Sequence, residues 1–199
     1  MLDIVESSLR EAQQSLANLL ANKEMLGTIA SAGADLGAAL KRGQRVFSCG
    51  NGGSMCDAMH FAEELSGRYR DNRAALAAQA ISDVGHMTCV ANDFGYEFVF
   101  SRYLEAHGRQ GDFLLAISTS GKSRSILNAV DVAHQRGMKV IGMHGKPGCA
   151  LEAVSDYSIC TPGGAYADRV QELHIKIIHI MIQMAEQVNF GAAAKTATV

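Results

Sequence analysis

The sequence has no excess of basic residues. Lys and Arg together number 18, Asp and Glu number 20, and the formal net charge is −2 over 199 residues. A protein that holds a nucleic-acid backbone needs a concentration of cationic side chains to neutralise the phosphates. The charge balance therefore argues against nucleic acid as a direct partner.

Cysteine pairs, long apolar runs and a basic leader are also missing. The five cysteines are scattered and form no Cys-x-x-Cys pair, which argues against a disulfide framework and a structural zinc site. No uncharged apolar run is long enough to cross a membrane, and residues 1–6 carry acid where a signal peptide has Lys or Arg. We therefore expect a soluble cytoplasmic protein with reduced thiols and no membrane partner.

The periodicity of apolar residues predicts the fold class. Residues 1–42 repeat at helical spacing and predict two amphipathic helices, whereas short apolar runs alternate with helical patterns after Gly43. The alternation is typical of a parallel sheet covered by helices. We expect an α/β three-layer sandwich in one domain over residues 1–190, followed by a disordered tail at 191–199. Strands are expected at 45–49, 77–81, 87–91, 112–117, 138–143 and 157–160, and helices at 54–66, 96–106, 123–135 and 168–188.

The expected helix 168–188 is apolar on nearly every side, so we expect it to be buried at a subunit interface. Gln171, His174 and His179 lie on it, and buried polar side chains must find partners; interhelical hydrogen bonds are the preferred account for His174. Gln171 and His179 are eight residues apart, about 12 Å of helical rise. Their convergence on one ion would require long side chains, a bend or sharing between subunits.

A glycine-rich turn, Cys49-Gly50-Asn51-Gly52-Gly53-Ser54, follows the first expected strand and leads into a helix. Such a turn is a usual place for an anion or a sugar. On the helix, His60 and Glu64 are four residues apart, which places both side chains on one face, within reach of one metal ion or one substrate. A solvated His–Glu pair is the alternative.

A second turn between strand and helix, residues 117–123, carries four hydroxyl groups in the run Ser118-Thr119-Ser120-Gly121-Lys122-Ser123. Hydroxyls and free backbone N–H groups at a helix start bind phosphate well. The alternative, one serine that caps the helix, leaves three hydroxyls unexplained. A P-loop needs a glycine five residues before Gly121, where Ala116 stands, so a nucleoside triphosphate site is disfavoured.

Five segments together make the chain resemble the phosphoheptose (sedoheptulose-7-phosphate) isomerases of the sugar-isomerase (SIS) family. Besides the two turns, they are His60-Phe61-Ala62-Glu63-Glu64-Leu65, Ala91-Asn92-Asp93-Phe94-Gly95, and the stretch from Tyr166-Ala167-Asp168-Arg169 through Gln171-Glu172 to His179. For Asn92 and Asp93 an ordinary Asx turn is the alternative. The resemblance covers the chain except its tail and implies an SIS fold. Lys122 departs from relatives that often carry Asn there.

The resemblance also implies an activity and a site. It implies a homotetrameric cytoplasmic enzyme that converts D-sedoheptulose 7-phosphate to D-glycero-D-manno-heptose 7-phosphate, the first step toward the heptose of bacterial lipopolysaccharide. It implies one zinc ion (Zn²⁺) per subunit held by His60, Glu64, Gln171 and His179. The substrate-binding positions that it implies are Asn51, Gly52, Gly53, Glu64, Asn92, Asp93, Ser118, Thr119, Ser120, Ser123 and Gln171.

Aldose–ketose exchange moves a proton between C1 and C2 through an enediol, so it needs a base and an acid. Glu64 is the candidate base and His179 the candidate acid. A metal bound to Glu64 would lower its basicity, so the ligand and base roles compete and the sequence leaves both open.

Three other kinds of SIS protein are alternatives. A non-catalytic relative binds the bacterial replication initiator, but it lacks a carboxylate at the position of Glu64. Sugar-phosphate regulators carry a DNA-binding segment, and arabinose-phosphate isomerases usually carry an added regulatory pair, for which 199 residues leave no room. The retained carboxylate therefore favours the heptose phosphate isomerase.

Overall fold

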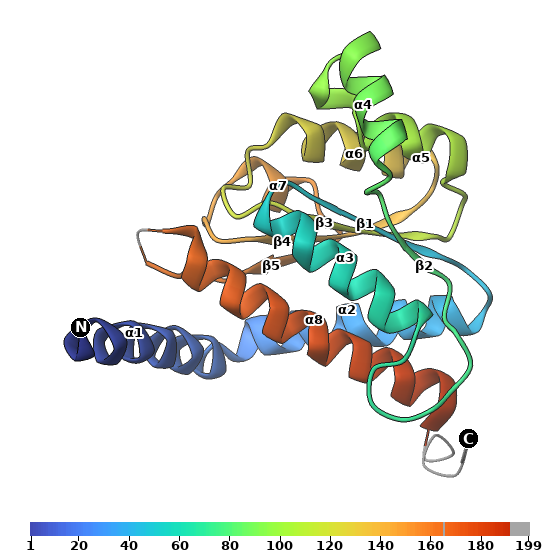
Figure 1. The fold of residues 1–199 in the computed structure, drawn as a ribbon. Coiled ribbons are helices and arrows are strands. Elements are labelled where there is room, and N and C mark those ends of the chain that lie inside the picture. The colour runs from blue at the N-terminus through green and yellow to red at the C-terminus, as the bar shows by residue number, and fades with distance from the viewer. Residues whose placement is uncertain (165, 192–199) are drawn as a thin grey trace.

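The computed structural model describes residues 1–164 and 166–191, and in them a five-stranded parallel sheet lies between two layers of helices (Figure 1). The strand order is β2-β1-β3-β4-β5, and every neighbouring pair is parallel. The strands are β1 (Val46–Gly50), β2 (Ala78–Ala80), β3 (Phe113–Ile117), β4 (Lys139–His144) and β5 (Tyr157–Cys160). The helices are α1 (Leu2–Ala21), α2 (Lys23–Lys41), α3 (Gly53–Ser66), α4 (Val84–Asp93), α5 (Ser101–His107), α6 (Arg124–Gln135), α7 (Ala150–Ala153) and α8 (Ala167–Phe190), with a 3₁₀ turn η1 (Tyr96–Phe98).

These elements confirm the expected three-layer α/β architecture and the two N-terminal helices. The domain boundaries stay a prediction, and the expected tail lies outside the described residues except for Gly191. None of the helices within residues 1–164 and 166–191 combines the length and apolar character that a membrane span requires.

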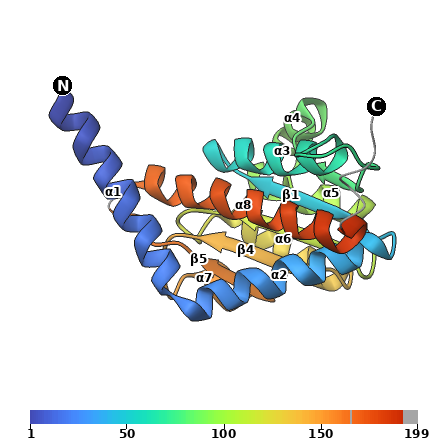
Figure 2. The same ribbon diagram turned by 90° about the horizontal axis from the view of Figure 1, so that it is seen from below.

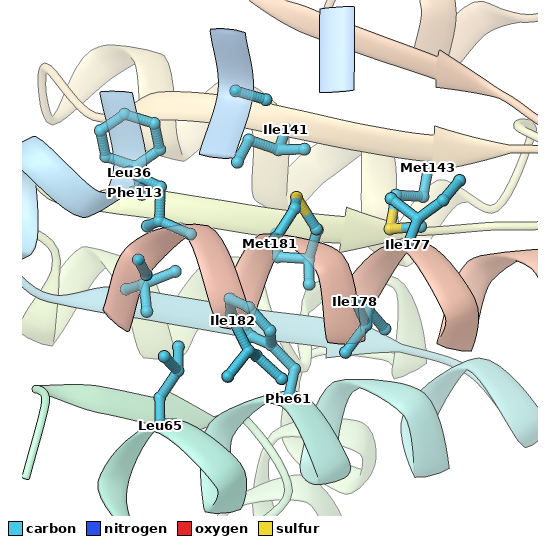
Figure 3. Packing of buried hydrophobic residues seen from close by; sticks show 14 of the residues in the cluster. Leu36, Phe61, Leu65, Phe113, Ile141, Met143, Ile177, Ile178, Met181 and Ile182 are labelled. Carbon is cyan, nitrogen blue, oxygen red and sulfur yellow. The ribbon is translucent and has the colours of Figure 1, made fainter. Parts of the chain in front are cut away.

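Each face of the sheet is covered by its own hydrophobic cluster, because side chains of a strand point alternately to opposite faces. On β3, Phe113, Leu115 and Ile117 pack with α2, α3 and α8, whereas Leu114 and Ala116 pack with α5 and α6. Figure 3 shows the first cluster between α8, α3 and the sheet. A strand buried on both faces reads as a continuous apolar run, which is how β3 was recognisable in the sequence.

The expected strand at 87–91 is wrong, because these residues belong to helix α4. Asp83 occupies the N-cap position, and its side chain accepts a hydrogen bond from the His86 backbone N–H at 2.7 Å. This cap stabilises a helix start that the short run of apolar and β-branched residues did not indicate. The expected helix 96–106 is divided into η1 and α5, since Val99 N–H bonds to Tyr96 O in the 3₁₀ pattern.

The apolar residues of α8 are mostly buried within the chain, so packing inside one chain accounts for most of its apolar surface; the expected subunit interface stays a prediction. Ile177, Ile178, Met181 and Ile182 are fully inaccessible and pack against α2, α3 and the sheet (Figure 3). Of the isoleucines and methionines of α8, which the structure describes in full, only Ile180 is exposed, with 38% of its surface accessible. The helix is apolar on several sides because it lies between two helices and the sheet.

His174 of α8 is buried in this layer, and neither of its ring nitrogens has a hydrogen-bond partner among the described residues. The interhelical hydrogen bonds expected for it are therefore not formed. Burial lowers the pKa of His174 to about 4, so the ring is neutral in the folded protein near neutral pH. The unfolded chain, in which a histidine has a pKa of about 6.5, takes up a proton earlier on acidification.

We expect acidification to destabilise the protein through His174. Between pH 6.5 and 4 the unfolded state binds more protons than the folded state, so stability falls as the pH falls, by roughly 2–3 kcal/mol at pH 4.5. Urea unfolding at pH 7 and pH 4.5 measures the loss. His174→Leu should reduce it, leaving a remainder because burial also lowers the pKa of His144. An unchanged pH dependence in His174→Leu would contradict this origin.

Candidate active site

Two turns lie side by side at the carboxyl ends of β1 and β3: the glycine turn, residues 49–54, and the serine turn, residues 117–123. Gly50 of β1 pairs with Ile117 of β3, and the chain leaves β1 toward β2 but leaves β3 toward β4. Helix α3 then covers one face of the sheet and α6 the other (Figure 1). Doubly wound folds bind ligands at such a reversal of strand order, outside the carboxyl ends of the strands.

Glycine is required at several positions of the glycine turn for steric reasons. Gly52 has φ of +56°, a left-handed conformation, where the chain enters α3. A Cβ on Gly50 would lie 2.3 Å from the Ser54 carbonyl oxygen, and a Cβ on Gly53 would lie 2.6 Å from Nε2 of Gln171. The turn is therefore tight on both sides, and its second glycine contact places α8 directly against the start of α3.

Asn51 connects the glycine turn to the opposite layer of helices. Its Nδ2 donates to Ser125 Oγ on α6 at 3.0 Å, and its Oδ1 accepts from the Tyr96 hydroxyl at 2.7 Å. Asn92 and Asp93 lie at the exposed end of α4, where the Asn92 amide donates to the Asp93 carboxylate at 2.7 Å. They have no hydrogen bond to the other expected substrate-binding residues among the described contacts.

The hydroxyl groups of the serine turn gather in front of α6. Ser118 Oγ lies 3.0 Å from Ser123 Oγ and 3.5 Å from Ser120 Oγ, and Ser120 Oγ accepts from the Lys122 N–H at 3.3 Å. Ser123 occupies the N-cap position of α6 but makes no capping hydrogen bond, which contradicts the simple cap alternative. Thr119 completes the turn, and its carbonyl accepts from Gly145 N–H at 3.0 Å. Clustered hydroxyls before a helix start suit a phosphate.

His60 on α3 and His179 on α8 face each other between the two helices. Their Nε2 atoms are 2.9 Å apart, and Glu64 Oε1 lies 3.6 Å from His60 Nε2. The ring of Tyr69 stacks on His179 with 5.5 Å between ring centroids. Glu64 is 17% exposed, so the arrangement differs from the solvated His–Glu pair. The structure thus brings together three of the four side chains implied as zinc ligands.

Gln171, the fourth, is placed elsewhere along the same helix. Its amide contacts Gly53 at the start of α3, eight residues and about two helical turns before His179. The side chain of Gln171 therefore lies against the glycine turn, and no hydrogen bond from it to His60, Glu64 or His179 is among the described contacts. This separation agrees with the rise expected from the sequence.

Burial and neighbouring charges perturb the pKa values in this group. Burial raises the pKa of Glu64, with a further increase from the charges of Glu63 and Glu186. Burial and the charge of His60 lower the pKa of His179. Both shifts move the groups away from their charged forms, and a carboxylate of raised pKa is a more effective base near neutral pH.

Several residues of the site were missed in the sequence. Burial raises the pKa of Asp57, one turn before His60, to about 6, and its Oδ2 is buried without a partner in the described structure. Tyr69 and Arg73 lie in the segment after α3, and both contact α8: Tyr69 stacks on His179, and Arg73 donates to Glu186. Arg73 carries a weak sequence signal, because a cation just after a helix end often binds its last carbonyl groups.

Two groups of side chains among the described residues could hold a metal ion, with ligand atoms within 4.8 Å of one another: His60, Glu63 and Glu64, and His144, Cys149 and Glu152. In the second group both ring nitrogens of His144 already have partners, Lys146 O at 3.1 Å and Ser158 Oγ at 2.8 Å. In the first group His179 adds a further nitrogen. Nitrogen and oxygen donors that face one another at this spacing fit a zinc ion.

Comparisons with known proteins match the chain over nearly its whole length. A family model described as "SIS domain" matches residues 9–145. "Phosphoheptose isomerase" of Yersinia enterocolitica is 54% identical over 93% of this chain and 96% of its own, and that of Photorhabdus laumondii is 55% identical over the same shares. A phosphoheptose isomerase structure from Neisseria gonorrhoeae has a TM-score of 0.86 at 34% identity, covering 94% of this chain and 98% of that one. One from Francisella tularensis has a TM-score of 0.88 at 33% identity with the same coverage.

Proposed function

We infer that this chain, which belongs to the phosphoheptose isomerase family of SIS-domain proteins, is an isomerase that converts D-sedoheptulose 7-phosphate to D-glycero-D-manno-heptose 7-phosphate. The observation that carries the inference is the convergence of Glu64 and His179 on His60 between α3 and α8, with α3 starting just after β1 at the β1–β3 reversal. We place the reaction in the cytoplasm, as the first step toward the heptose of lipopolysaccharide.

Two parts of the site divide the work. The hydroxyls of Ser118, Thr119, Ser120 and Ser123 and the start of α6 bind the phosphate of the substrate. With the phosphate held there, C1 and C2 of the sugar are proposed to lie next to Glu64 on α3 and His179 on α8. Glu64 then takes the proton from one carbon and returns it to the other, while His179 exchanges a proton with the sugar oxygens. The remaining substrate positions are Asn51, Gly52, Gly53, Asn92, Asp93 and Gln171.

The site fits a zinc ion held by His60, Glu64 and His179. Gln171 is the proposed fourth ligand, and its amide would have to leave Gly53 to reach the ion. Two imidazole nitrogens 2.9 Å apart can share one proton or turn both lone pairs toward a cation, and the nearby carboxylate favours the cation. When bound, zinc would polarise the sugar oxygens. The group around His144 is the weaker candidate because its imidazole is already hydrogen-bonded on both sides.

Removal of either histidine is expected to abolish zinc binding. Protein purified without an affinity tag should carry about one zinc ion per subunit, and His60→Ala and His179→Ala should each carry almost none. Elemental analysis before and after chelator treatment measures this. If both variants keep the full metal content, the shared site is wrong. Glu152→Gln serves as the control for the group around His144 and should leave the zinc content unchanged.

The homotetramer is part of the same proposal and is supported by α1. This helix has no buried residue and extends away from the sheet in both views (Figures 1 and 2). Its exposed apolar side chains are Leu2, Ile4, Val5, Leu9, Leu16 and Leu20. Such a stripe is suited to burial against other copies of the chain. Light scattering should give about four times the chain mass of 21.2 kDa, and a monomer would contradict the proposal.

The activity itself is tested by incubating the purified protein with D-sedoheptulose 7-phosphate and following the appearance of an aldose phosphate. We expect conversion to an equilibrium mixture that is reached from either sugar. Binding of the sugar phosphate without any conversion would identify a non-catalytic SIS protein and would overturn the proposal.

A further inference from the structure

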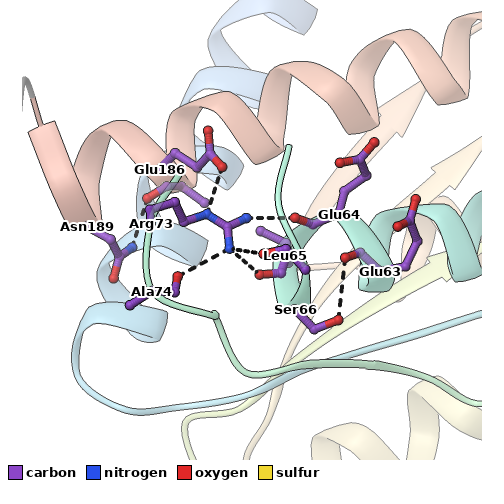
Figure 4. Close-up of polar contacts among 10 residues, drawn as sticks. Glu63, Glu64, Leu65, Ser66, Arg73, Ala74, Glu186 and Asn189 are labelled. Atoms are coloured by element: carbon purple, nitrogen blue, oxygen red, sulfur yellow. Dashed lines mark hydrogen bonds and ion pairs between the residues drawn. The ribbon is translucent and has the colours of Figure 1, made fainter. Parts of the chain in front are cut away.

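Arg73 is buried between the end of α3 and the C-terminal part of α8, and every part of its guanidinium is engaged (Figure 4). Its side chain is 1% exposed, and Nε donates to Glu186 Oε1 of α8 at 2.8 Å. Nη2 donates to the carbonyl oxygen of Glu64 at 2.6 Å. Nη1 donates to three carbonyl oxygens, those of Leu65 at 2.8 Å, Gly67 at 2.9 Å and Ala74 at 3.2 Å.

These contacts close the C-terminal end of α3. The last carbonyl groups of a helix have no partner within the helix and carry partial negative charge, which a cation stabilises. Arginine can satisfy several of them at once because its donors form a rigid planar fork. The carbonyl of Glu64 is one of those bound, so the guanidinium holds the backbone of the candidate base directly.

The same guanidinium connects α3 to the helix that carries His179. Glu186 follows His179 by seven residues, about two turns, and therefore lies on the same face of α8. Along the paired helices, the contact of Gly53 with Gln171, the His60–His179 pair and the Arg73–Glu186 pair follow in order. Through its contacts with the end of α3 and with Glu186, Arg73 therefore fixes the two helices just beyond Glu64 and His179.

We propose that Arg73 is a positioning residue that sets the register of α3 against α8, and through it the geometry of Glu64 and His179. The proposal rests on the proposed isomerase function for its kinetic consequence. A purely structural ion pair is the competing account. The two accounts differ in the kcat that they predict when both charges are removed together. Replacing a buried ion pair by apolar groups often restores stability. A purely structural pair should then give wild-type kcat, whereas a positioning residue leaves kcat low.

The test uses Arg73→Met, Glu186→Met, the double variant and Arg73→Lys in the full chain. We expect Arg73→Met to lower stability, because Glu186 and the carbonyl oxygens at the end of α3 lose their partner; the double variant should recover the part that comes from the unpaired Glu186 charge. The kcat of the double variant should stay on the order of 10²-fold below wild type, since small displacements of catalytic groups have effects of that size. KM should change little because the serine turn is untouched. Wild-type kcat in the double variant would overturn the proposal.

Two further measurements guard against misfolding of the double variant. Arg73→Lys keeps the charge beside Glu186 but cannot reach all the carbonyl groups, so it should fold and still lose kcat; wild-type kcat here would count equally against Arg73. Arg45→Met, at the opposite end of β1, is the matched control. It breaks a pair with Asp112, which is 2% exposed, and should cost stability while kcat stays unchanged. If this control also loses kcat, the loss in the Arg73 variants comes from lower stability, and the proposal is overturned.

Zinc affinity gives a readout that does not need turnover. Competition with a chromophoric chelator should show affinity about tenfold or more weaker in the double variant than in wild type and Arg45→Met, as for other residues that orient metal ligands. Equal affinity in all three would contradict the positioning role. Failure of the proposed function shows separately, as absence of turnover in wild type, and the zinc comparison still decides the role of Arg73.

Discussion

Glu64→Gln is expected to lower kcat by about 10²–10⁴-fold, the usual cost of removing a general base. Gln keeps the shape of the side chain but cannot accept the proton from the sugar carbon. The serine turn lies on other elements, so the fold and binding of the sugar phosphate should be largely intact. Steady-state kinetics, together with binding of sedoheptulose 7-phosphate by calorimetry, measures both quantities.

Glu63→Gln is the matched control for this variant. Glu63 is the neighbouring carboxylate on α3; it lies 3.2 Å from His60 Nδ1, and its side chain is 66% exposed, against 17% for Glu64. Its replacement should therefore cost far less activity. If Glu64→Gln keeps more than a tenth of wild-type turnover, Glu64 is not the base, and its role is confined to holding metal or substrate.

The second large effect is expected from Ser120→Ala combined with Ser123→Ala. Each hydroxyl that binds the phosphate contributes about 1.5–3 kcal/mol, as hydrogen bonds to charged groups do. Since each 1.4 kcal/mol is about tenfold in affinity, KM for sedoheptulose 7-phosphate should rise by about a hundredfold or more. The turnover at saturation should fall less, because Glu64 and His179 are unchanged.

Unphosphorylated sedoheptulose provides the control for this prediction. It should be a poor substrate for the wild-type protein, and the double serine variant should treat it no differently, because no phosphate is present to lose contacts. An unchanged KM for the phosphorylated sugar, or equal activity on the two sugars, would place the phosphate at another part of the protein.

Local pattern was sufficient for most of the fold. Strands such as β3 are continuous apolar runs, and helices such as α6 follow a helical repeat, so their periodicity alone identified them. The failure at α4 has a local cause, since a run of five apolar and β-branched residues fits either structure and the cap from Asp83 decided it. The surroundings of α8 depended on tertiary packing, which a single helix pattern cannot show.

The candidate site was predictable where its residues are close in sequence. The spacing of His60 and Glu64 places them on one face of one helix, and the hydroxyls of the serine turn are consecutive. The approach of His179 to His60 links residues 119 apart and was available only from the family resemblance. Arg73 reaches Glu186 across 113 residues, and no spacing rule predicts such a contact.

The proposed reaction requires Glu64 to move a proton between C1 and C2 of a sugar phosphate through an enediol. Conversion of D-sedoheptulose 7-phosphate by the wild-type protein in D₂O, followed by NMR, tests it most directly. We expect an aldose phosphate that carries deuterium at C2, because a protonated carboxylate exchanges with solvent before it returns the proton. Absence of any aldose phosphate, or transfer of the original hydrogen from C1 to C2 without solvent deuterium at a rate that Glu64→Gln leaves unchanged, would contradict it.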